Sequence, residues 1–311
     1  MVKAIGLMSG GLDSVLAVKI LLEQGVDVYG VCFVNPFGSR CDYAVKAAKQ
    51  LGIPIKLINL SEDYLGIIRN PKHGVGAGMN PCVDCRIFML KKAKEYADKI
   101  GARFIFSGEV LGQRPMSQTK AAIELIERKS EVEVLRPLSA KLLPETEAEK
   151  NKYVDREKLF DISGRRRERQ LELAKKYKLI YASPAGGCLL CEKDFSKRLK
   201  DLFEHRKKID LHDIEFLKVG RHFRSKGDKI IVGRDEKENE RLLELKGKKD
   251  IVIEAKDIPG PVTILQGKDV ELASRITMRY ADADEGIINV NGDEIKVKAI
   301  GDSELKQYRI K

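Results

Sequence analysis

No stretch of this 311-residue sequence reaches the roughly 18 consecutive apolar residues that a membrane-spanning helix needs. A signal-peptide layout is missing as well, because a strand-like run at residues 2–8 stands where a charged segment and then an apolar one would be. Internal repeats and low-complexity segments are also absent. These absences argue against a membrane protein and predict a cytoplasmic one, long enough for two ordinary domains.

The last third of the sequence has no net charge, although the whole chain carries +11. Residues 201–311 hold 23 Lys and Arg against 23 Asp and Glu, which leaves 35 against 24 for residues 1–200. Such an excess favours a polyanionic partner such as a nucleic acid, and it places most of the attraction in the first two thirds of the chain. The charged surface of a heat-adapted protein is the alternative interpretation.

Strand-like and helix-like segments alternate over the first 135 residues. Strands are expected at residues 3–8, 26–34, 53–60, 103–107 and 132–135, with helices between them. This alternation predicts an α/β fold, in which a parallel sheet carries helices on both faces. Ligands of such sheets bind at the carboxyl ends of the strands, so Ser9 after the first strand and Gly108 after the fourth are expected on one edge.

Short strands replace this alternation in the last hundred residues. Gly227-Asp228 and Asn291-Gly292 are hairpin signals there, and one helix is expected at about residues 269–280. We therefore predict two domains, residues 1–208 and a smaller α+β domain at residues 209–311.

The junction of the first strand and helix lacks the lysine of a Walker loop. Residues 9–14 read Ser-Gly-Gly-Leu-Asp-Ser. Adjacent glycines let the backbone approach an anion, and the start of the following helix adds its positive dipole end. Ser9 and Ser14 add hydroxyl donors, while Asp13 is suited to hold Mg²⁺ or to orient the loop. Without the Gly-Lys-Ser/Thr ending, the loop favours release of pyrophosphate over transfer of a γ-phosphoryl group.

The string at residues 8–14 resembles the signature of the PP-loop ATP pyrophosphatases, which include tRNA thiouridine synthetases, tRNA lysidine synthetase, argininosuccinate synthetase, GMP synthetase and NAD synthetase. The resemblance implies an adenine nucleotide alpha-hydrolase-like fold. It also implies that a substrate oxygen attacks ATP, giving an adenylate and pyrophosphate, before a nucleophile displaces AMP. The ATP-binding residues implied are Met8, Ser9, Gly10, Gly11, Asp13, Ser14, Phe33, Gly108 and Gln113.

Four of the six cysteines form two C-x-x-C pairs, Cys82/Cys85 before a predicted helix and Cys188/Cys191 about a hundred residues later. In a reducing cytoplasm no structural disulfide is expected, and Cys32, in an apolar run, is interpreted as a small buried hydrophobic residue. The helix dipole is expected to lower the thiol pKa beside the first pair. Two pairs at this separation can converge on zinc or on an iron–sulfur cluster.

The cysteine segments sharpen the resemblance. Residues 80–85 (Asn-Pro-x-x-x-Cys) and 186–192 (Gly-x-Cys-x-x-x-Glu) resemble the two catalytic-cysteine segments of the bacterial tRNA 2-thiouridylases, which tend to have glycine at the position of Cys191. Residues 108–113, 117–118 and 135–138 resemble the tRNA 4-thiouridine synthetases, without their N-terminal THUMP module. The resemblance implies a tRNA sulfurtransferase that favours the 4-position of uracil, with Asp13, Cys85 and Cys188 as catalytic residues.

Two sulfur chemistries remain open for such an enzyme. Cys82, Cys85 and Cys188 would hold a [4Fe-4S] cluster whose open iron carries an exchangeable sulfide, with Cys191 dispensable. Alternatively, a persulfide on one cysteine delivers sulfur and a second cysteine resolves it through a disulfide. A structural zinc site is a third interpretation. Both thiolation routes need a sulfur donor, either sulfide or a persulfide carrier.

Contacts with tRNA are expected from a basic run, although an exposed helix face would look the same. The run comprises Arg165, Arg166, Arg167 and Arg169. Residues 219–239 weakly resemble the small RNA-binding NFACT-R module, with arginines on a predicted hairpin. His73 and His222 show no acid–base partner in the sequence, so surface or capping roles are expected for them.

Two other classes of function remain as alternatives. One is a PP-loop ligase or amidotransferase that acts on a small metabolite, although the cysteine pairs argue against it. The other is a non-catalytic RNA-binding protein, which the intact phosphate loop argues against.

Overall fold

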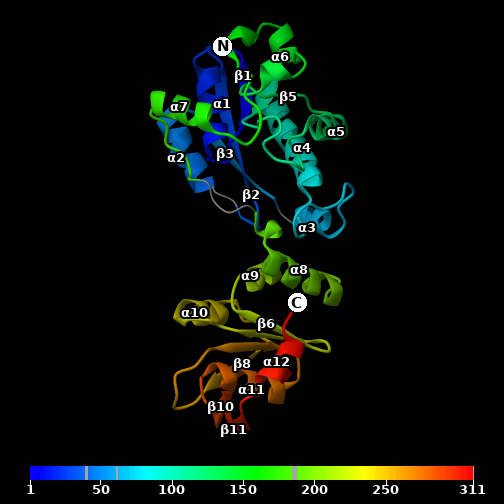
Figure 1. Cartoon of the computed structure of the whole chain (residues 1–311), viewed down its shortest axis with the longest axis vertical. Helices are drawn as coiled ribbons and strands as arrows, with labels where there is room; N and C mark the ends of the chain where they lie inside the picture. Colours follow the sequence, from blue (N-terminus) through cyan, green and yellow to red (C-terminus); the bar gives the residue numbers. More distant parts are fainter. Residues whose placement is uncertain (39–40, 61, 184–187, 311) are drawn as a thin grey trace. The chain divides into compact units, whose positions relative to one another are not determined.

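The computed structural model describes residues 1–38, 41–60, 62–183 and 188–310. The chain divides into two compact units, Met1–Cys191 and Glu192–Lys311 (Figure 1). The division precedes helix α8 (Lys193–His205), which packs against α9 (Leu211–Leu217), whereas the sequence placed a boundary after residue 208. In the part of the chain described, no helix is both long and apolar enough to cross a membrane.

The first unit is built on a five-stranded sheet in the order β3-β2-β1-β4-β5, with every neighbouring pair parallel. The predicted fold class is therefore confirmed. The order of the strands reverses between β1 and β4, so the crevice where ligands bind such sheets opens at the ends of these two strands. The strands are β1 (Lys3–Leu7), β2 (Asp27–Val34), β3 (Ile55–Asn59), β4 (Phe104–Ser107) and β5 (Val134–Leu135).

Apolar side chains alternate between the two faces of this sheet, as the pleat of a strand requires. Ala4 packs in a cluster with residues of α1, α2 and α7, whereas its neighbour Ile5 packs with residues of α4 and α5. Helices thus cover both faces, as predicted. The α-helices of this unit are α1 (Leu12–Leu22), α2 (Cys41–Leu51), α3 (Glu62–Arg69), α4 (Cys82–Ile100), α5 (Lys120–Ser130), α6 (Glu147–Lys150) and α7 (Glu168–Lys176).

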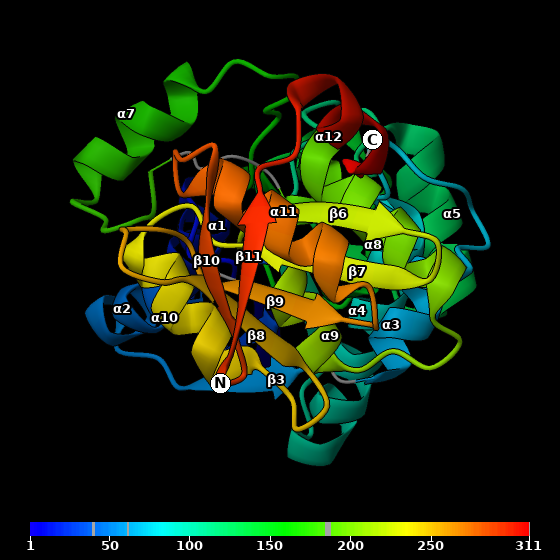
Figure 2. The same ribbon diagram turned by 90° about the horizontal axis from the view of Figure 1, so that it is seen from below.

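The second unit contains a six-stranded antiparallel sheet in the order β11-β10-β8-β9-β7-β6. Figure 2 looks onto this sheet and shows α11 lying across it. The predicted hairpin at Asn291-Gly292 joins β10 to β11, and both residues have a positive φ, as a tight hairpin turn requires. The remaining elements are β6 (Arg221–Ser225), β7 (Asp228–Val232), α10 (Glu236–Leu245), β8 (Ile251–Ala255), β9 (Thr263–Gln266), α11 (Val270–Tyr280), β10 (Glu285–Val290), β11 (Asp293–Lys298) and α12 (Asp302–Tyr308).

Charged residues are buried beneath β6 and β7. Asp201 accepts hydrogen bonds from Arg224 at 2.9 Å and from Lys229 at 3.2 Å, and burial lowers the pKa of Lys229 to about 8. A surface or capping role was expected for His222, and the surface part of that expectation was wrong. That residue is buried, its Nε2 lies 2.7 Å from the carbonyl oxygen of Val219, and burial holds its pKa well below the usual value.

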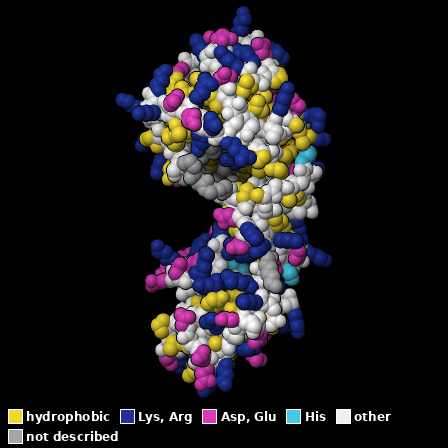
Figure 3. Space-filling model, in the orientation of Figure 1, with side chains coloured by type: hydrophobic (Ala, Val, Ile, Leu, Met, Phe, Trp, Pro, Cys, Tyr) yellow, Lys and Arg dark blue, Asp and Glu magenta, His cyan; other side chains and the backbone are white. Residues whose placement is uncertain are grey.

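The arginines of the predicted basic hairpin are engaged inside the second unit. Besides Arg224, Arg234 donates to Glu238 at 2.9 Å, and Arg221 donates to the carbonyl oxygen of Gly233 at 2.9 Å. These side chains therefore stabilise the unit, whatever else they contact. On the face shown in Figure 3, Lys and Arg side chains lie among Asp and Glu over both units.

Candidate functional site

The phosphate loop, residues 9–14, leaves β1 and turns directly into α1. Gly10 has a φ of +74°, and a Cβ there would lie 2.5 Å from the backbone nitrogen of Ala44, so this position requires glycine. The Ser14 hydroxyl donates to the carbonyl oxygen of Gly11 at 2.8 Å, and Ser9 Oγ accepts the N–H of Gly11 at 3.4 Å. Among the described residues, no side chain caps the start of α1, which leaves its first N–H groups available to bind an anion.

Gly108 brings the end of β4 against the same loop. A Cβ at this position would lie 2.4 Å from the carbonyl oxygen of Asp13, so no other residue type fits. Leu7 of β1 pairs with Ser107 of β4. Ser9 and Gly108 therefore lie on one edge of the sheet, as the sequence predicted.

Two further residues implied in ATP binding belong to the core. The side chain of Met8 is buried in the apolar layer beneath α1, and its N–H donates to the carbonyl oxygen of Val31 at 2.8 Å. Phe33, near the end of β2, is half-buried and packs in the layer of α4. Because the side chain of Met8 is enclosed, it is not accessible to a ligand.

Asp13, in the first turn of α1, is the acidic group of the phosphate loop. Gln113 donates to its Oδ2 at 3.2 Å, and the guanidinium of Arg167 lies 4.0 Å from the same oxygen. Burial raises the pKa of Asp13, and these neighbours only partly oppose the rise. Its other oxygen, Oδ1, is buried without a hydrogen-bond partner among the described residues. Carboxylate oxygens are ligands that Mg²⁺ prefers, so Asp13 fits a magnesium ion bound together with nucleotide phosphates.

The four arginines of the basic run have different surroundings. Arg165 and Arg166 are exposed just before α7. Arg169 donates to Asp161 at 2.6 Å and is about half exposed. Arg167 instead faces the phosphate loop, which the sequence pattern did not indicate.

The two cysteine pairs come together in the first unit. The N–H of Met79 donates to the carbonyl oxygen of Leu190 at 2.8 Å, and the side-chain amide of Asn80 donates to the sulfur of Cys191 at 2.8 Å. These bonds join the loop before α4 to the turn that carries Cys188 and Cys191. The two loops therefore lie together, as convergence of the pairs would require. Gly186 of the second cysteine segment lies outside the described residues.

The thiols are largely buried. Cys85 shares a hydrogen bond of 3.0 Å with the hydroxyl of Tyr64, and Cys188 lies 3.7 Å from the carbonyl oxygen of Phe37. Burial raises the pKa of Cys82 and Cys85 and raises that of Cys188 to about 12, and neighbouring thiols add to each rise. The expectation of a lowered thiol pKa at the start of α4 was wrong, because desolvation outweighs the helix dipole.

The chemistry of this donor set suits zinc or an iron–sulfur cluster, since thiolates are soft ligands. In the described ranges, no three His, Cys, Asp or Glu side chains are arranged around a common metal position. The sulfurs instead contact Tyr64, Asn80 and the backbone of Phe37. Metal binding would therefore replace these contacts and displace the thiol protons.

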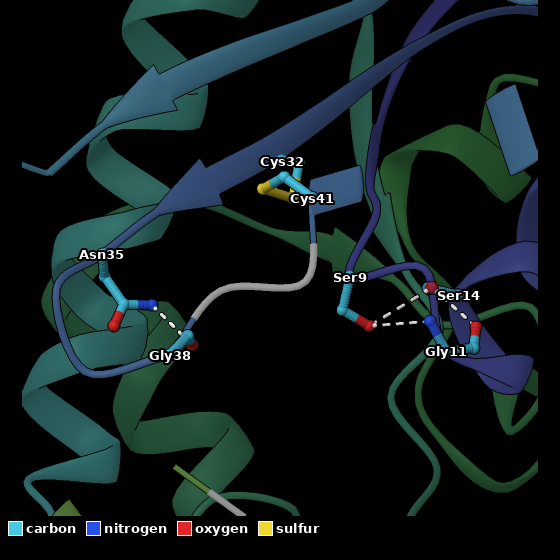
Figure 4. Close-up of a disulfide and its surroundings, with 7 residues drawn as sticks. All are labelled: Ser9, Gly11, Ser14, Cys32, Asn35, Gly38 and Cys41. Carbon is cyan, nitrogen blue, oxygen red and sulfur yellow. Dashed lines mark hydrogen bonds between the residues drawn. A yellow bond between two sulfur atoms is a disulfide. The ribbon is translucent and has the colours of Figure 1, made fainter. Parts of the chain in front are cut away.

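Cys32 and Cys41 form a disulfide, so the expectation that the chain has none was wrong. The bond joins β2 to the first residue of α2, and Figure 4 shows it in the same region as Ser9 of the phosphate loop. Phe37, within the closed loop, accepts the N–H of Leu189 at 3.0 Å. The loop therefore links the start of α2 to the second cysteine turn.

His73 has an acidic partner that the sequence did not reveal. Its Nδ1 lies 2.8 Å from one carboxylate oxygen of Asp84, and its backbone N–H donates to the other at 2.9 Å. Asp84 is a buried residue of α4, between the two cysteines of the first pair. The pairing fixes the loop before α4 against the helix that carries these cysteines.

Sequence reasoning also missed two arginines whose charges act on the thiols. Arg86 binds Glu109 at 3.1 Å, and its positive charge acts on Cys82 and Cys85. Arg114 is exposed, and its charge acts on both Asp13 and Cys82. The phosphate loop and the thiols therefore lie within electrostatic range of one cation.

Comparisons with known proteins cover both units. Residues 2–142 match the family model described as thiamine biosynthesis protein (ThiI), and residues 220–309 match the NFACT protein RNA binding domain. The tRNA-specific 2-thiouridylase MnmA of Listeria monocytogenes serotype 4b (strain CLIP80459) is 26% identical over 212 residues, covering 62% of this chain and 54% of that protein.

A second relative and a solved structure extend the comparison. The tRNA sulfurtransferase of Photorhabdus laumondii subsp. laumondii is 31% identical over 139 residues, covering 43% of this chain and 28% of that protein. The chain thus spans about half or less of these two curated relatives. A 4-thiouridine synthetase solved in complex with RNA and bound ATP is 24% identical, with 70% of this chain and 52% of that chain covered and a TM-score of 0.38.

Proposed function

Since the chain belongs to the tRNA thiouridine synthetase branch of the PP-loop ATP pyrophosphatases, we propose that it uses ATP to adenylate a uracil carbonyl oxygen of tRNA and then replaces that oxygen with sulfur. One observation carries the proposal. The first unit contains both the phosphate loop, where no side chain of the described residues caps the start of α1, and the four free cysteines. The positive charge of Arg114 acts on Asp13 of the loop and on the thiol of Cys82.

In the first step, the N–H groups at the start of α1 and the hydroxyls of Ser9 and Ser14 bind the phosphates of ATP. Asp13 would hold Mg²⁺ against them. The uracil oxygen attacks the α-phosphorus, the bond from that phosphorus to the bridging oxygen breaks, and its electron pair leaves with pyrophosphate. The carbon that bore the carbonyl oxygen is then activated, because AMP is a good leaving group.

In the second step, sulfur attacks this carbon and AMP departs. Cys188 is six residues beyond Ala182, whose N–H donates to the carbonyl oxygen of Gly10 at 2.8 Å. Six extended residues span at most about 20 Å, so this thiol is within that distance of the phosphate loop. The length of chain between them therefore allows the cysteine site to serve the same reaction.

Cys82, Cys85 and Cys188 are the proposed ligands of a [4Fe-4S] cluster, which would supply an iron open to sulfide from the donor. Cys191 is not needed as a ligand in this proposal, because three protein thiolates leave the fourth iron open to sulfide. The second route is a persulfide on Cys188. Its outer sulfur would displace AMP, and the thiol of Cys85 would then attack the inner sulfur, releasing the thiouridine and leaving a disulfide for an external dithiol to reduce.

The 4-position of uracil is favoured over the 2-position. Residues 108–113, which resemble the 4-thiouridine synthetases, contact the phosphate loop through Gly108 and bind Asp13 through Gln113. For tRNA, we assign backbone contacts in the first unit to Arg165, Arg166 and Arg169. The RNA-binding match over residues 220–309 supports a second contact surface in the C-terminal unit.

Release of pyrophosphate from ATP by the full chain, with and without tRNA, tests this function. We expect release that requires tRNA and that Asp13→Ala abolishes while the circular dichroism spectrum is unchanged. Glu124→Ala, which removes an exposed carboxylate of α5, is the control and should behave as the parent. Equal release without tRNA would favour a ligase or amidotransferase of small metabolites. Tight tRNA binding with no release would favour a non-catalytic RNA-binding protein.

A further inference from the structure

The disulfide between Cys32 and Cys41 closes a surface loop that has one deeply buried residue. The loop runs from β2 to the first residue of α2, and Figure 4 shows the disulfide together with Asn35 and Gly38 of this loop. Gly38 is exposed, whereas the side chain of Phe37 beside it is fully buried. The contacts of Phe37 therefore show what the closed loop is attached to.

The backbone of Phe37 holds the second cysteine turn. Its carbonyl oxygen accepts the N–H of Leu189 at 3.0 Å, and it also accepts the thiol of Cys188 at 3.7 Å. Both donors meet on one carbonyl group, so the position of Phe37 sets the position of Cys188.

The ring of Phe37 reaches the first cysteine pair through Tyr64. The centroids of the two rings are 6.1 Å apart, and the hydroxyl of Tyr64 shares the 3.0 Å hydrogen bond with Cys85. Both rings are fully buried, and in a close-packed interior a shift of one ring displaces the other. Phe37 therefore connects the disulfide to Cys85 as well as to Cys188.

We propose that the Cys32–Cys41 bond is a redox switch for these two thiols. While the bond is formed, Phe37 holds Cys85 and Cys188 in their present contacts, and reduction of the bond releases them to bind a cluster or to carry a persulfide. The inference rests on the proposed function and adds the regulation of its cysteine site. The oxidised form fits the closed state, because no three metal-ligating side chains of the described residues are arranged around a common position.

An external dithiol would operate the switch. One of its thiolates attacks a sulfur of the Cys32–Cys41 bond, which breaks, and its second thiol then resolves the mixed disulfide. Two electrons and two protons pass to the chain, giving two thiols, and the dithiol leaves as a disulfide. Cys32 and Cys41 are buried, but Cys41 begins α2, and the ends of helices open most readily.

Alkylation rates of the individual thiols test this coupling. The full chain, freed of metal by a chelator, is treated with iodoacetamide in its disulfide form and after anaerobic reduction, and the labelled peptides are quantified by mass spectrometry. Reduction should speed the alkylation of Cys85 and Cys188 about fivefold, the equivalent of one ordinary hydrogen bond. Cys82 and Cys191, which bond to Asn80 instead, are internal controls and should change little.

Two variants separate the coupling from a general loss of stability. Ala at both Cys32 and Cys41 should give the rates of the reduced parent without any reductant. Tyr64→Phe keeps the ring and removes the hydroxyl, so in the disulfide form it should speed the alkylation of Cys85 alone. Equal acceleration of all four thiols after reduction would show general loosening and would overturn the inference.

Equal rates in the disulfide and reduced forms would also overturn it. The side chain of Asn35, which accepts the N–H of Phe37 at 2.9 Å, would then hold the loop without the disulfide. A change in pyrophosphate release with unchanged alkylation would overturn it too, because the disulfide would act through α2, whose Ala44 lies against Gly10.

The proposed function has a separate signature in the same samples. Pyrophosphate release that requires tRNA should be equal in the two forms, because adenylation does not use the thiols. Absence of release from both forms would be a failure of the proposed function, and the alkylation rates would still decide whether the disulfide controls the thiols.

Discussion

The side-chain amide of Asn80 donates a 2.8 Å hydrogen bond to the sulfur of Cys191, and this contact joins the two cysteine loops. It gives Cys191 a structural partner that is independent of any metal. A serine hydroxyl can accept the same hydrogen bond, so the contact between the two cysteine loops does not require a thiol at position 191. Of the four free cysteines, Cys82, Cys85 and Cys188 are the three that we propose as cluster ligands, because three thiolates leave the fourth iron open to sulfide.

Cys191→Ser should therefore retain the cluster. We expect protein purified without oxygen to be brown and to hold roughly four iron atoms per chain, both in the parent and in this variant. Serine at Cys82, Cys85 or Cys188 should lose the iron and the thiolation. Iron content and visible absorbance measure this. Zinc in place of iron would make the site structural, and loss of iron from Cys191→Ser would mean four protein ligands.

The exposed pair Arg165 and Arg166 should set part of the salt dependence of tRNA binding. Replacing both with Ala should lower the slope of log affinity against log salt by roughly two, since each phosphate contact releases about one counterion. Fluorescence anisotropy of labelled tRNA over a salt series measures the slope. Lys56 and Lys99, exposed on β3 and α4, are the control pair. An equal loss in the control would trace the effect to net charge.

The disulfide should contribute measurably to the stability of the first unit. Cys32 and Cys41 are nine residues apart, and closing such a loop stabilises a protein by about 2 to 3 kcal/mol in the chain-entropy model. The variant with Ala at both positions should lose this stability in urea unfolding and no longer respond to reductant. Four free thiols should be titrated in unreduced, denatured parent protein. Six would show that the bond does not form.

Lys229 should make the stability of the C-terminal unit depend on pH. Burial lowers the pKa of Lys229 from 10.5 to about 8, so between these pH values the unfolded chain holds a proton that the folded chain has released. The free energy of unfolding should therefore rise across this window, by about 3 kcal/mol. Lys229→Met should flatten the rise. Urea unfolding at several pH values measures it, and parallel profiles for parent and variant would contradict the assignment.

The features predicted correctly from sequence are those set by short stretches of chain. The glycine loop at residues 9–14 and the turn at Asn291-Gly292 depend on local backbone geometry, which is indicated by their residue types. The strand–helix alternation likewise identified the sheet, and hence the shared edge of Ser9 and Gly108.

The features that sequence reasoning missed depend on contacts between distant segments. Arg167 lies near Asp13 only because α7 packs against α1. The spacing of residues in the sequence does not predict a contact between positions more than 150 residues apart. Asp84 is eleven residues from His73, but a loop of irregular shape brings them together. The raised pKa of the cysteine thiols has the same origin, because burial is decided by the packing of the whole unit.

The most direct measurement of the central claim is a nucleoside analysis of tRNA after reaction with the full chain. Unmodified tRNA, ATP, Mg²⁺ and sulfide are incubated with anaerobically purified protein. The nucleosides of the tRNA are then separated and identified by mass spectrometry. We expect 4-thiouridine, with one AMP and one pyrophosphate formed for each sulfur incorporated. 2-Thiouridine would correct the position but keep the chemistry. The account would be contradicted if ATP were converted to ADP and phosphate. It would also be contradicted if the tRNA contained no thiouridine after the reaction.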